Sequence, residues 1–195
     1  ESILLSRPRE TLRIDEDVRT GQLAYQLARP YNFVLYRFAQ MWGERLPRFL
    51  LTLAAAALLA TLFSGGAGIG WGGLLAGPPA LLLALTIDFL FVLAISLLAF
   101  WVEDTTPFLF IYDRFLMILG GMLLPLELFP GPLEAAARVL PFSAIVYAPA
   151  RMFVDPDPAR LAVLLLQQAI TLLVAVVIAG GLFRYAERRL QTNGG

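Results

Sequence analysis

Four long apolar segments restrict the fold of this chain more than any other feature of its sequence. They cover residues 49–63, 79–101, 108–124 and 161–183, and the charged residues inside them are Asp88, Asp113 and Arg114. A helix needs about 20 apolar residues to cross a bilayer. Since lipid offers no hydrogen bonds to the backbone, such segments cross as helices. The sequence therefore predicts an all-α polytopic membrane protein.

We expect four transmembrane helices, with the first beginning before its apolar block because that block is short. The predicted spans are residues 47–64, 79–101, 108–125 and 160–184, within a transmembrane domain of residues 49–195. Residues 1–48 are polar and rich in arginine, which predicts a cytoplasmic and interfacial segment.

The composition agrees with a membrane protein and excludes several classes of function. Hydrophobic residues make up 58% of the chain and charged residues 15%, with a formal net charge of zero. A zero net charge gives no sign of nucleic-acid binding. The chain contains no cysteine, histidine or lysine, so all of its basic residues are arginine. It therefore has no thiolate chemistry, no histidine base and no Walker A lysine for nucleotide phosphates.

The placement of arginine predicts the orientation, because positively charged flanks stay in the cytoplasm. Arginines are dense before residue 49 and after residue 183, so we expect both ends of this chain in the cytoplasm. An even number of crossings then places the loop at 64–78 outside, the VEDTTP loop at 102–107 inside and residues 125–160 outside.

Residues 120–142 break the third apolar segment with prolines at 125, 130, 132 and 141. Broken backbone at membrane depth must be buried in protein or face a water-filled cavity. We predict a turn at FPGP, a short helix over 133–140 and a second short segment that Pro149 interrupts. This region, 125–155, would be a re-entrant helical hairpin; the alternative is an ordinary external loop with an interfacial helix. Asp157 is expected to cap the last helix, with Pro158 at its first position.

The polar N-terminal segment contains two short amphipathic pieces over residues 14–32. Gly21 separates the pieces and Pro30 ends the second one. An apolar stripe of this kind docks into a partner groove or lies on the membrane surface, and the pattern leaves both open. The aromatic and arginine residues that follow, over 31–48, predict an interfacial anchor.

Asp88 is the acidic residue inside the second span, and a buried carboxylate at that depth faces the bundle interior or water. It could couple protons or contact a substrate, or it could be a structural acid bonded to a neighbouring helix; the structural role is favoured. Arg114 could reach Glu103 or Asp104 and hold the cytoplasmic loop. Gln167, Gln168 and Thr171 could form a polar seam in the last span, and Gly120, Gly121, Gly180 and Gly181 permit close helix contact.

Three motifs in order resemble the permease subunits of bacterial type-two ABC exporters, in the branch described as ABC-family transporter proteins. The first is DVRTGQLAYQLARP at 17–30, the second is FWVED at 100–104, and the third is GMLLPLELFPGPLEAAARVLPFSAIVYAPA at 121–150. The resemblance covers nearly the whole chain. Members of this family usually have six spans, so the chain resembles one without its first two, and we expect a missing N-terminal part.

The resemblance implies a function for the first and the third motif. The first would be a coupling helix on a separate ATPase subunit, which would bind ATP and Mg²⁺, while this chain would bind no cofactor. The third would form the outer gate, and two permease subunits would face each other across the transport path in the bacterial inner membrane. The implied ATPase-coupling residues are Asp17, Arg19, Gly21, Leu23, Leu27, Arg29 and Pro30. The implied outer-gate residues are Pro125, Glu127, Phe129, Pro130, Pro141 and Phe142.

Two other functions remain open from the residues alone. One is a proton-coupled secondary carrier that uses Asp88 and Glu127, which would transport without an ATPase. The other is a membrane scaffold that does not transport.

Overall fold

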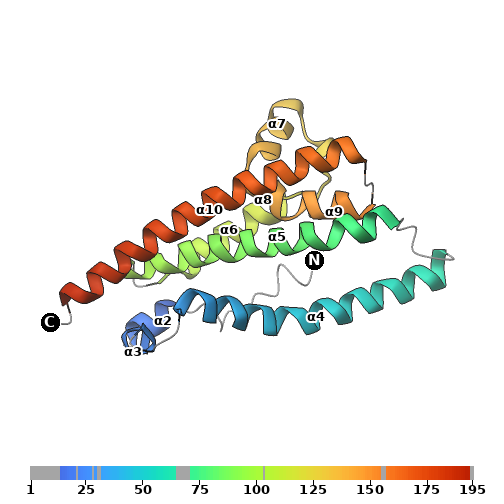
Figure 1. Cartoon of the computed structure of the whole chain (residues 1–195). Helices are drawn as coiled ribbons and strands as arrows, with labels where there is room; N and C mark the ends of the chain where they lie inside the picture. Colours follow the sequence, from blue (N-terminus) through green and yellow to red (C-terminus); the bar gives the residue numbers. More distant parts are fainter. Residues whose placement is uncertain are drawn as a thin grey trace. The chain divides into compact units, whose positions relative to one another are not determined.

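Every element in the described part of the chain is a helix. The computed structural model describes residues 14–20, 22–27, 29, 32–64, 71–102, 104–154 and 157–193. The helices are α2 (Ile14–Arg19), α3 (Gln22–Leu27), α4 (Phe33–Ser64), α5 (Trp71–Ser96), η1 (Leu97–Phe100), α6 (Thr106–Leu119), η2 (Leu126–Leu128), α7 (Gly131–Val139), α8 (Pro141–Ile145), α9 (Tyr147–Val154) and α10 (Pro158–Asn193). The predicted all-α class is confirmed for these residues (Figure 1).

The chain divides into two units, the first with α2–α4 and the second with α5–α10. In the first unit, α4 begins at Phe33 because Asn32 caps it: the Leu35 N–H donates to Asn32 Oδ1 at 3.1 Å. Its 32 residues correspond to about 48 Å of helix, and Pro47 lies inside it. The first apolar block is thus the second half of a longer helix, which agrees with the expectation that the helix starts before it.

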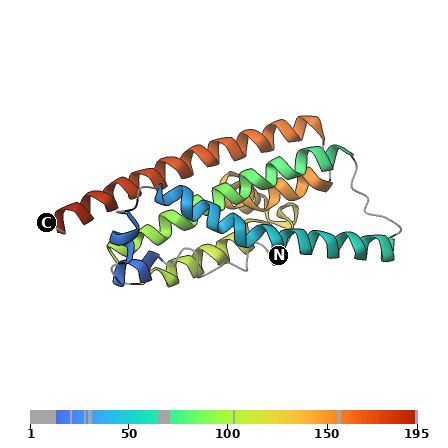
Figure 2. The ribbon, with the colours of Figure 1, turned by 60° about the horizontal axis from the view of Figure 1, so that its bottom comes forward.

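In the second unit, α5 is the central helix, and its largest interfaces are with α10 and α9. Helices α5 and α10 lie side by side and run in the same direction (Figures 1 and 2). One face of α10 is buried at a helical spacing of three and four residues, which is the pattern of a helix with one packed side. Its members are Gln168, Thr171, Ala175, Ala179 and Ala186.

Two helical stretches in the described residues are long and apolar enough to cross a membrane. The stretch Leu75–Phe100 has a mean hydropathy of 2.7 and is 56% buried. The stretch Pro158–Arg188 has a mean hydropathy of 2.6 and is only 11% buried. A soluble core helix would be mostly buried, so the exposure of α10 indicates a surface solvated by lipid. Helix α6 has 14 residues, about 21 Å, and ends at Leu119 rather than at 125. The crossings predicted for 47–64 and 108–125 stay predictions.

The sequence prediction was wrong about where the second long helix begins. The loop was expected to continue as far as Pro78, yet α5 starts at Trp71 and continues through Pro78 and Pro79. The prolines deprive two carbonyls of their helical donors. Packing offsets that cost, because Gly77 is buried against the ring of Phe153 on α9.

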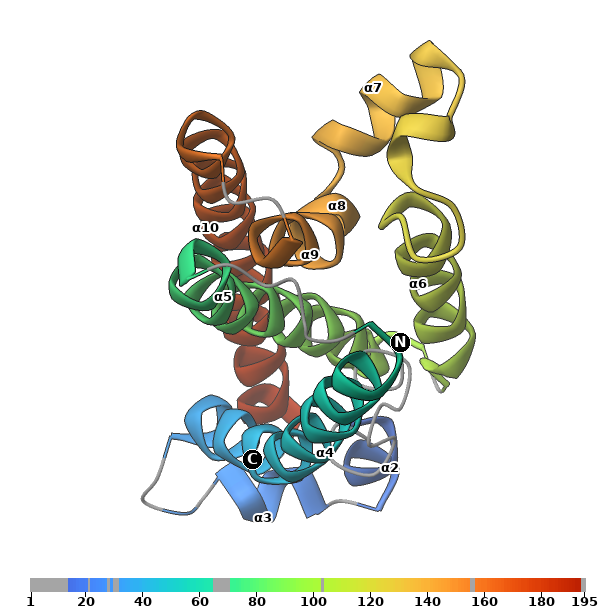
Figure 3. The same ribbon diagram turned by 90° about the vertical axis from the view of Figure 1, so that its right-hand side faces the viewer.

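The connection between α6 and α10 consists of a turn and four short helices, η2, α7, α8 and α9 (Figure 3). The chain leaves α6 at Gly121, whose φ of +82° favours glycine. Pro130 precedes α7, close to the predicted turn and helix. The predicted break at Pro149 was wrong: the chain breaks at Val146, and Pro149 is the third residue of α9. Proline is tolerated there because N–H groups of the first helical turn have no helical acceptor.

Helix α10 begins as the sequence predicted. Pro158 is its first residue, and the Ala159 N–H donates to Asp157 Oδ1 at 3.1 Å. Asp157 therefore caps the helix, and its carboxylate lies at the positive end of the helix dipole.

Candidate functional site

The predicted coupling segment consists of α2 and α3, and one arginine of α4 binds both of them. The Arg37 guanidinium pairs with the Asp17 carboxylate of α2 and donates to Gln26 Oε1 of α3 at 3.0 Å. The Arg37 side chain is 7% exposed and also lies over the Phe33 ring. A buried arginine with these partners holds the two short helices to the start of α4. The segment after residue 31 is thus more than an interfacial anchor.

The structure describes most, but not all, of the implied coupling residues. Asp17 is bound to Arg37, and the Arg29 guanidinium lies 5.2 Å from the centre of the Tyr25 ring. Arg19 lies in α2, and Leu23 and Leu27 lie in α3. Gly21 and Pro30 fall outside the described residues.

In the second unit, two adjacent glutamines of α10 bind the broken backbone of the connection. Gln168 is fully buried, and its amide nitrogen donates at 2.9 Å to the carbonyls of Ala80 on α5 and Ala144 on α8. Gln167 donates to the Arg138 carbonyl at the end of α7 and to Ser143 Oγ on α8. The last carbonyls of a helix lack helical donors. These glutamines therefore supply donors where α7 and α8 end.

Gln167 and Gln168 make the contacts between helices that the predicted polar seam requires, whereas the Thr171 hydroxyl donates within α10, to the Gln167 carbonyl at 2.8 Å. Of the glycines predicted to permit close helix contact, some lie against another segment and others do not. Gly120 lies against Val146, whereas nothing in the described structure lies within 4 Å of where a Cβ would stand at Gly180 or Gly181.

Glu127, an implied gate residue, belongs to a polar cluster centred on Tyr147. The Tyr147 hydroxyl donates to Glu127 Oε1 at 2.7 Å, and an Arg151 nitrogen lies 3.5 Å from the same oxygen. The guanidinium groups of Arg138 and Arg151 both lie over the Tyr147 ring, at 5.3 and 5.8 Å from its centre. The hydrogen bond from Tyr147 lowers the pKa of the Glu127 carboxyl below its ordinary value of 4.5, and Arg151 adds to this effect. Glu127 is thus a carboxylate at neutral pH.

The remaining implied gate residues form the turns and the packing of the connection. Pro125 and Pro130 precede η2 and α7, Phe129 follows η2, and Pro141 begins α8. The Phe142 ring lies 5.8 Å from the rings of Tyr112 and Phe115 on α6, between ring centres. Phe142 therefore attaches α8 to α6.

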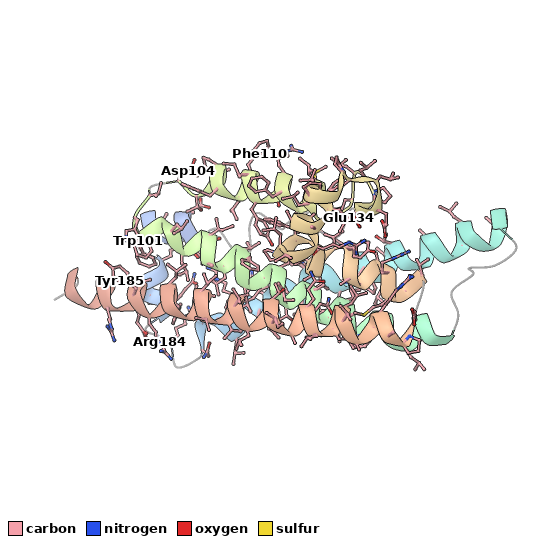
Figure 4. All side chains as sticks on the ribbon, turned by 90° about the horizontal axis from the view of Figure 1, so that it is seen from above. Trp101, Asp104, Phe110, Glu134, Arg184 and Tyr185 are labelled. Atoms are coloured by element: carbon pink, nitrogen blue, oxygen red, sulfur yellow. The ribbon has the colours of Figure 1, made fainter. Side chains whose placement is uncertain are left out.

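In the described residues, the structure shows Arg114 in contact with side chains of its own helix and not with Asp104. The Arg114 guanidinium lies 4.6 Å from the centre of the Phe110 ring and 3.5 Å from Met117 Sδ, and both partners are on α6. Asp104 instead accepts the Thr106 N–H at 2.9 Å and so stabilises the start of α6. Figure 4 shows Asp104 just before this helix and Phe110 on it. Glu103 lies outside the described residues.

Asp88 is fully buried on α5 and accepts the hydroxyl hydrogen of Tyr112, on α6, at 3.1 Å. Tyr112 is itself buried. A hydrogen bond to a neighbouring helix is what the structural role favoured from the sequence requires, and that role stays a prediction.

Sequence reasoning missed Arg37, Tyr147 and Arg151 as site residues. Tyr147 and Arg151 are four residues apart, a spacing that puts both on one face of a helix. That spacing was available in the sequence. The partners of Arg37 were not, because Asp17 is 20 residues away and on another helix.

Comparison with known proteins identifies the family of this chain. The family model described as ABC-2 family transporter protein matches residues 6–194. The chain belongs to this family. The search of curated proteins and the search of solved structures gave no match. As an ABC-2 family protein with exposed apolar helices, the chain is a membrane protein and a permease component of an ABC transporter.

Proposed function

We propose that this ABC-2 family chain is the permease subunit of an ATP-driven exporter in the bacterial inner membrane, with both of its ends in the cytoplasm. Two permease subunits would form the transport path, and a separate ATPase subunit would bind ATP and Mg²⁺. The family match over residues 6–194 is the observation that carries this proposal. The absence of lysine from the chain agrees with ATP hydrolysis by a partner.

In this proposal α2 and α3 form the coupling element that docks on the ATPase. Such an element must transfer its displacement to a membrane helix, and the contacts of Arg37 with Asp17 and Gln26 supply a mechanical connection to α4. Since Arg37 is buried, breaking its ion pair would leave a charge without its carboxylate and loosen both short helices.

The connection between α6 and α10 is the proposed re-entrant outer gate. The hydrogen bonds of Gln167 and Gln168 support this, because they satisfy helix-end carbonyls that lipid cannot satisfy. They also attach the gate to α10. ATP binding would close the ATPase dimer, move the coupling elements and shift the permease between inward-facing and outward-facing states.

The deciding experiment is co-purification of the protein with the ATPase encoded beside it. We expect the wild type to retain the ATPase, and we expect Leu23→Asp and Gly21→Pro to lose it. Arg37→Gln should weaken retention by loosening α2 and α3. Arg48→Gln is the matched control, because Arg48 is an exposed arginine of the same helix. If the wild type retains no ATPase, or if Leu23→Asp retains it fully, the coupling assignment is wrong.

The proton-coupled carrier makes an opposite prediction at Asp88. Asparagine cannot carry the transported proton, yet its amide oxygen can still accept the hydrogen bond from Tyr112. We therefore expect Asp88→Asn to keep ATP-dependent transport close to the wild-type level. The carrier would be favoured instead if Asp88→Asn lost transport and the wild type transported in the absence of any ATPase.

A further inference from the structure

A cavity lies where η2, α7 and α9 meet the start of α10. Its volume of about 570 Å³ is within the range of small-molecule sites. Its lining divides into charged and apolar parts and comprises Glu127, Arg138, Tyr147, Arg151, Ala159, Arg160, Val163 and Leu164.

The charged part of the lining favours an anion. It holds three guanidinium groups and one carboxylate, and the other two carboxylates that pair with these arginines, Glu134 and Asp157, are not part of the lining. Guanidinium is the side chain best suited to phosphate, since its planar N–H groups match the oxygens in pairs. Converging guanidiniums from three helices, α7, α9 and α10, are the arrangement that such a group needs.

Neighbouring carboxylates position these arginines to different degrees. Arg138 is held by Glu134 at 2.7 Å, whereas the pairs Arg151–Glu127 and Arg160–Asp157 are 3.5 and 3.6 Å long. The side chains of Arg160 and Asp157 are 57% and 45% exposed, and ion pairs so exposed contribute little. An anion in the cavity would compete with Glu127 for Arg151 and with Asp157 for Arg160, and these are the two longer pairs.

The apolar part of the lining continues out of the cavity along α10. Val163 begins a row of exposed apolar side chains that recur every three or four residues and so lie on one face. Their exposed fractions are 56–66%, and they are Val163, Leu166, Ile170, Leu173 and Val177. From first to last the row is about 21 Å long, which suits one extended acyl chain.

We infer that this cavity binds the anionic headgroup of an acyl-chain lipid, with phosphate as the recognised group and the chain lying along the exposed row of α10. The headgroup would contact arginines of α7, α9 and α10, of which Arg151 on α9 already pairs with Glu127 of η2. Such a lipid would stabilise the connection between α6 and α10 in one position. This inference concerns the chain alone and does not depend on an ATPase.

The test is lipid binding to the purified chain in neutral detergent, measured by native mass spectrometry and by titration. Phosphatidylglycerol is the probe, phosphatidylcholine with the same acyl chains is the zwitterionic control, and inorganic phosphate is the soluble anion. We expect one phosphatidylglycerol to be retained per chain, with an affinity at least about tenfold above that of phosphatidylcholine. The double variant Arg151→Gln/Arg160→Gln should lose this preference.

Three further single variants separate headgroup binding from folding and from acyl-chain contact. Arg160→Gln alone changes an exposed side chain and should reduce the preference without affecting folding. Arg184→Gln changes an exposed arginine near the other end of α10, far from Glu134 in Figure 4, and should leave the preference intact. Leu166→Gln should weaken phosphatidylglycerol binding only if the acyl chain lies along α10.

The outcomes separate the possible ligands. If inorganic phosphate displaces phosphatidylglycerol and Leu166→Gln has no effect, the site recognises phosphate from a soluble source. Equal binding of the two lipids, or an unchanged preference in the double variant, would overturn the inference. Neither result would alter the ATPase co-purification, so the two proposals fail independently.

Discussion

At the scale of single residues, Gln168 shows how this chain tolerates a broken helix next to apolar surroundings. Helix α8 ends at Ile145, which leaves the Ala144 carbonyl near a helix end without a helical donor. The buried amide of Gln168 donates to that carbonyl and to the Ala80 carbonyl on α5. One side chain therefore joins three helices, α5, α8 and α10.

Replacing this amide should destabilise the fold measurably. We expect Gln168→Leu to lower the free energy of unfolding by about 1–3 kcal/mol, because a buried carbonyl loses its donor. For a chain of this size that corresponds to a melting temperature lower by several degrees. The melting temperature is measured by thermal unfolding in detergent, monitored by circular dichroism. Val177→Ala, at an exposed position of the same helix, should change little. Equal melting temperatures for the two variants would contradict the role of Gln168.

The ion pair and hydrogen bond at Glu127 should make stability depend on pH. The folded-state pKa of Glu127 is below its ordinary value of 4.5, mainly because Tyr147 donates to the carboxylate. The stabilisation is thus fully present above pH 4.5 and is lost as the pH falls through the lower folded-state pKa. We expect the wild type to melt above Glu127→Gln at neutral pH and the difference to shrink below pH 4.5. A difference that does not change between pH 7 and pH 3 would rule this out.

At the scale of helices, the interface between α5 and α9 depends on the absence of a side chain at Gly77. A Cβ there would stand 2.5 Å from two carbons of the Phe153 ring. Gly180, in the middle of α10, has no described atom within 4 Å of the corresponding position. The two glycines are therefore a matched pair, one required by packing and one not.

Alanine substitutions should separate these two glycines. Gly77→Ala should lower the melting temperature, because the ring of Phe153 must move and α9 with it. Gly180→Ala should leave it unchanged or raise it, since alanine favours a helix by about 1 kcal/mol over glycine. The double variant Gly77→Ala/Phe153→Leu should recover part of the loss. An unchanged melting temperature in Gly77→Ala would show that α9 does not pack on α5 in this way.

The helices that the sequence predicted well are those whose ends carry local chemical signals. Asp157 and Pro158 mark the start of α10, and Pro130 marks the start of α7. The start of α5 and the break at Val146 were missed, because both depend on packing between distant segments. Prolines at 78, 79 and 149 favour a boundary locally, yet Gly77 against Phe153 and the first turn of α9 accommodate them.

In the candidate sites, too, local signals were predicted from the sequence and contacts between distant segments were not. The sequence identified Glu127 and the polar residues of α10, but the partners that give them a role come from other helices. Tyr147 is 20 residues from Glu127, and Ala80 is 88 residues from Gln168. No spacing rule within one helix predicts such pairs.

At the scale of the whole molecule, the second unit has a defined polarity. The Trp101 ring, after η1, stacks on the Tyr185 ring of α10, with 5.0 Å between the ring centres. Figure 4 shows both residues toward the C-terminal end of α10. Since α5 and α10 run in the same direction, the loop before α6 and the C-terminal end of α10 lie at one end of the unit. The connection with α7 and the start of α10 lie at the other end (Figure 1). This is the arrangement that two parallel membrane crossings require.

The positive-inside rule assigns the end with the loop before α6 and the C-terminal end of α10 to the cytoplasm. Cysteine labelling can test this orientation. The chain has no cysteine, so a single introduced cysteine reports its own position. We expect a membrane-impermeant maleimide to label Gly131→Cys in intact spheroplasts, and to label Asp104→Cys and Glu187→Cys only after the membrane is opened. The cysteine-free chain is the control. Labelling of Asp104→Cys and Glu187→Cys from opposite sides would contradict the parallel arrangement of α5 and α10. Labelling of both from outside would instead reverse the orientation and place the lipid-headgroup cavity on the cytoplasmic side.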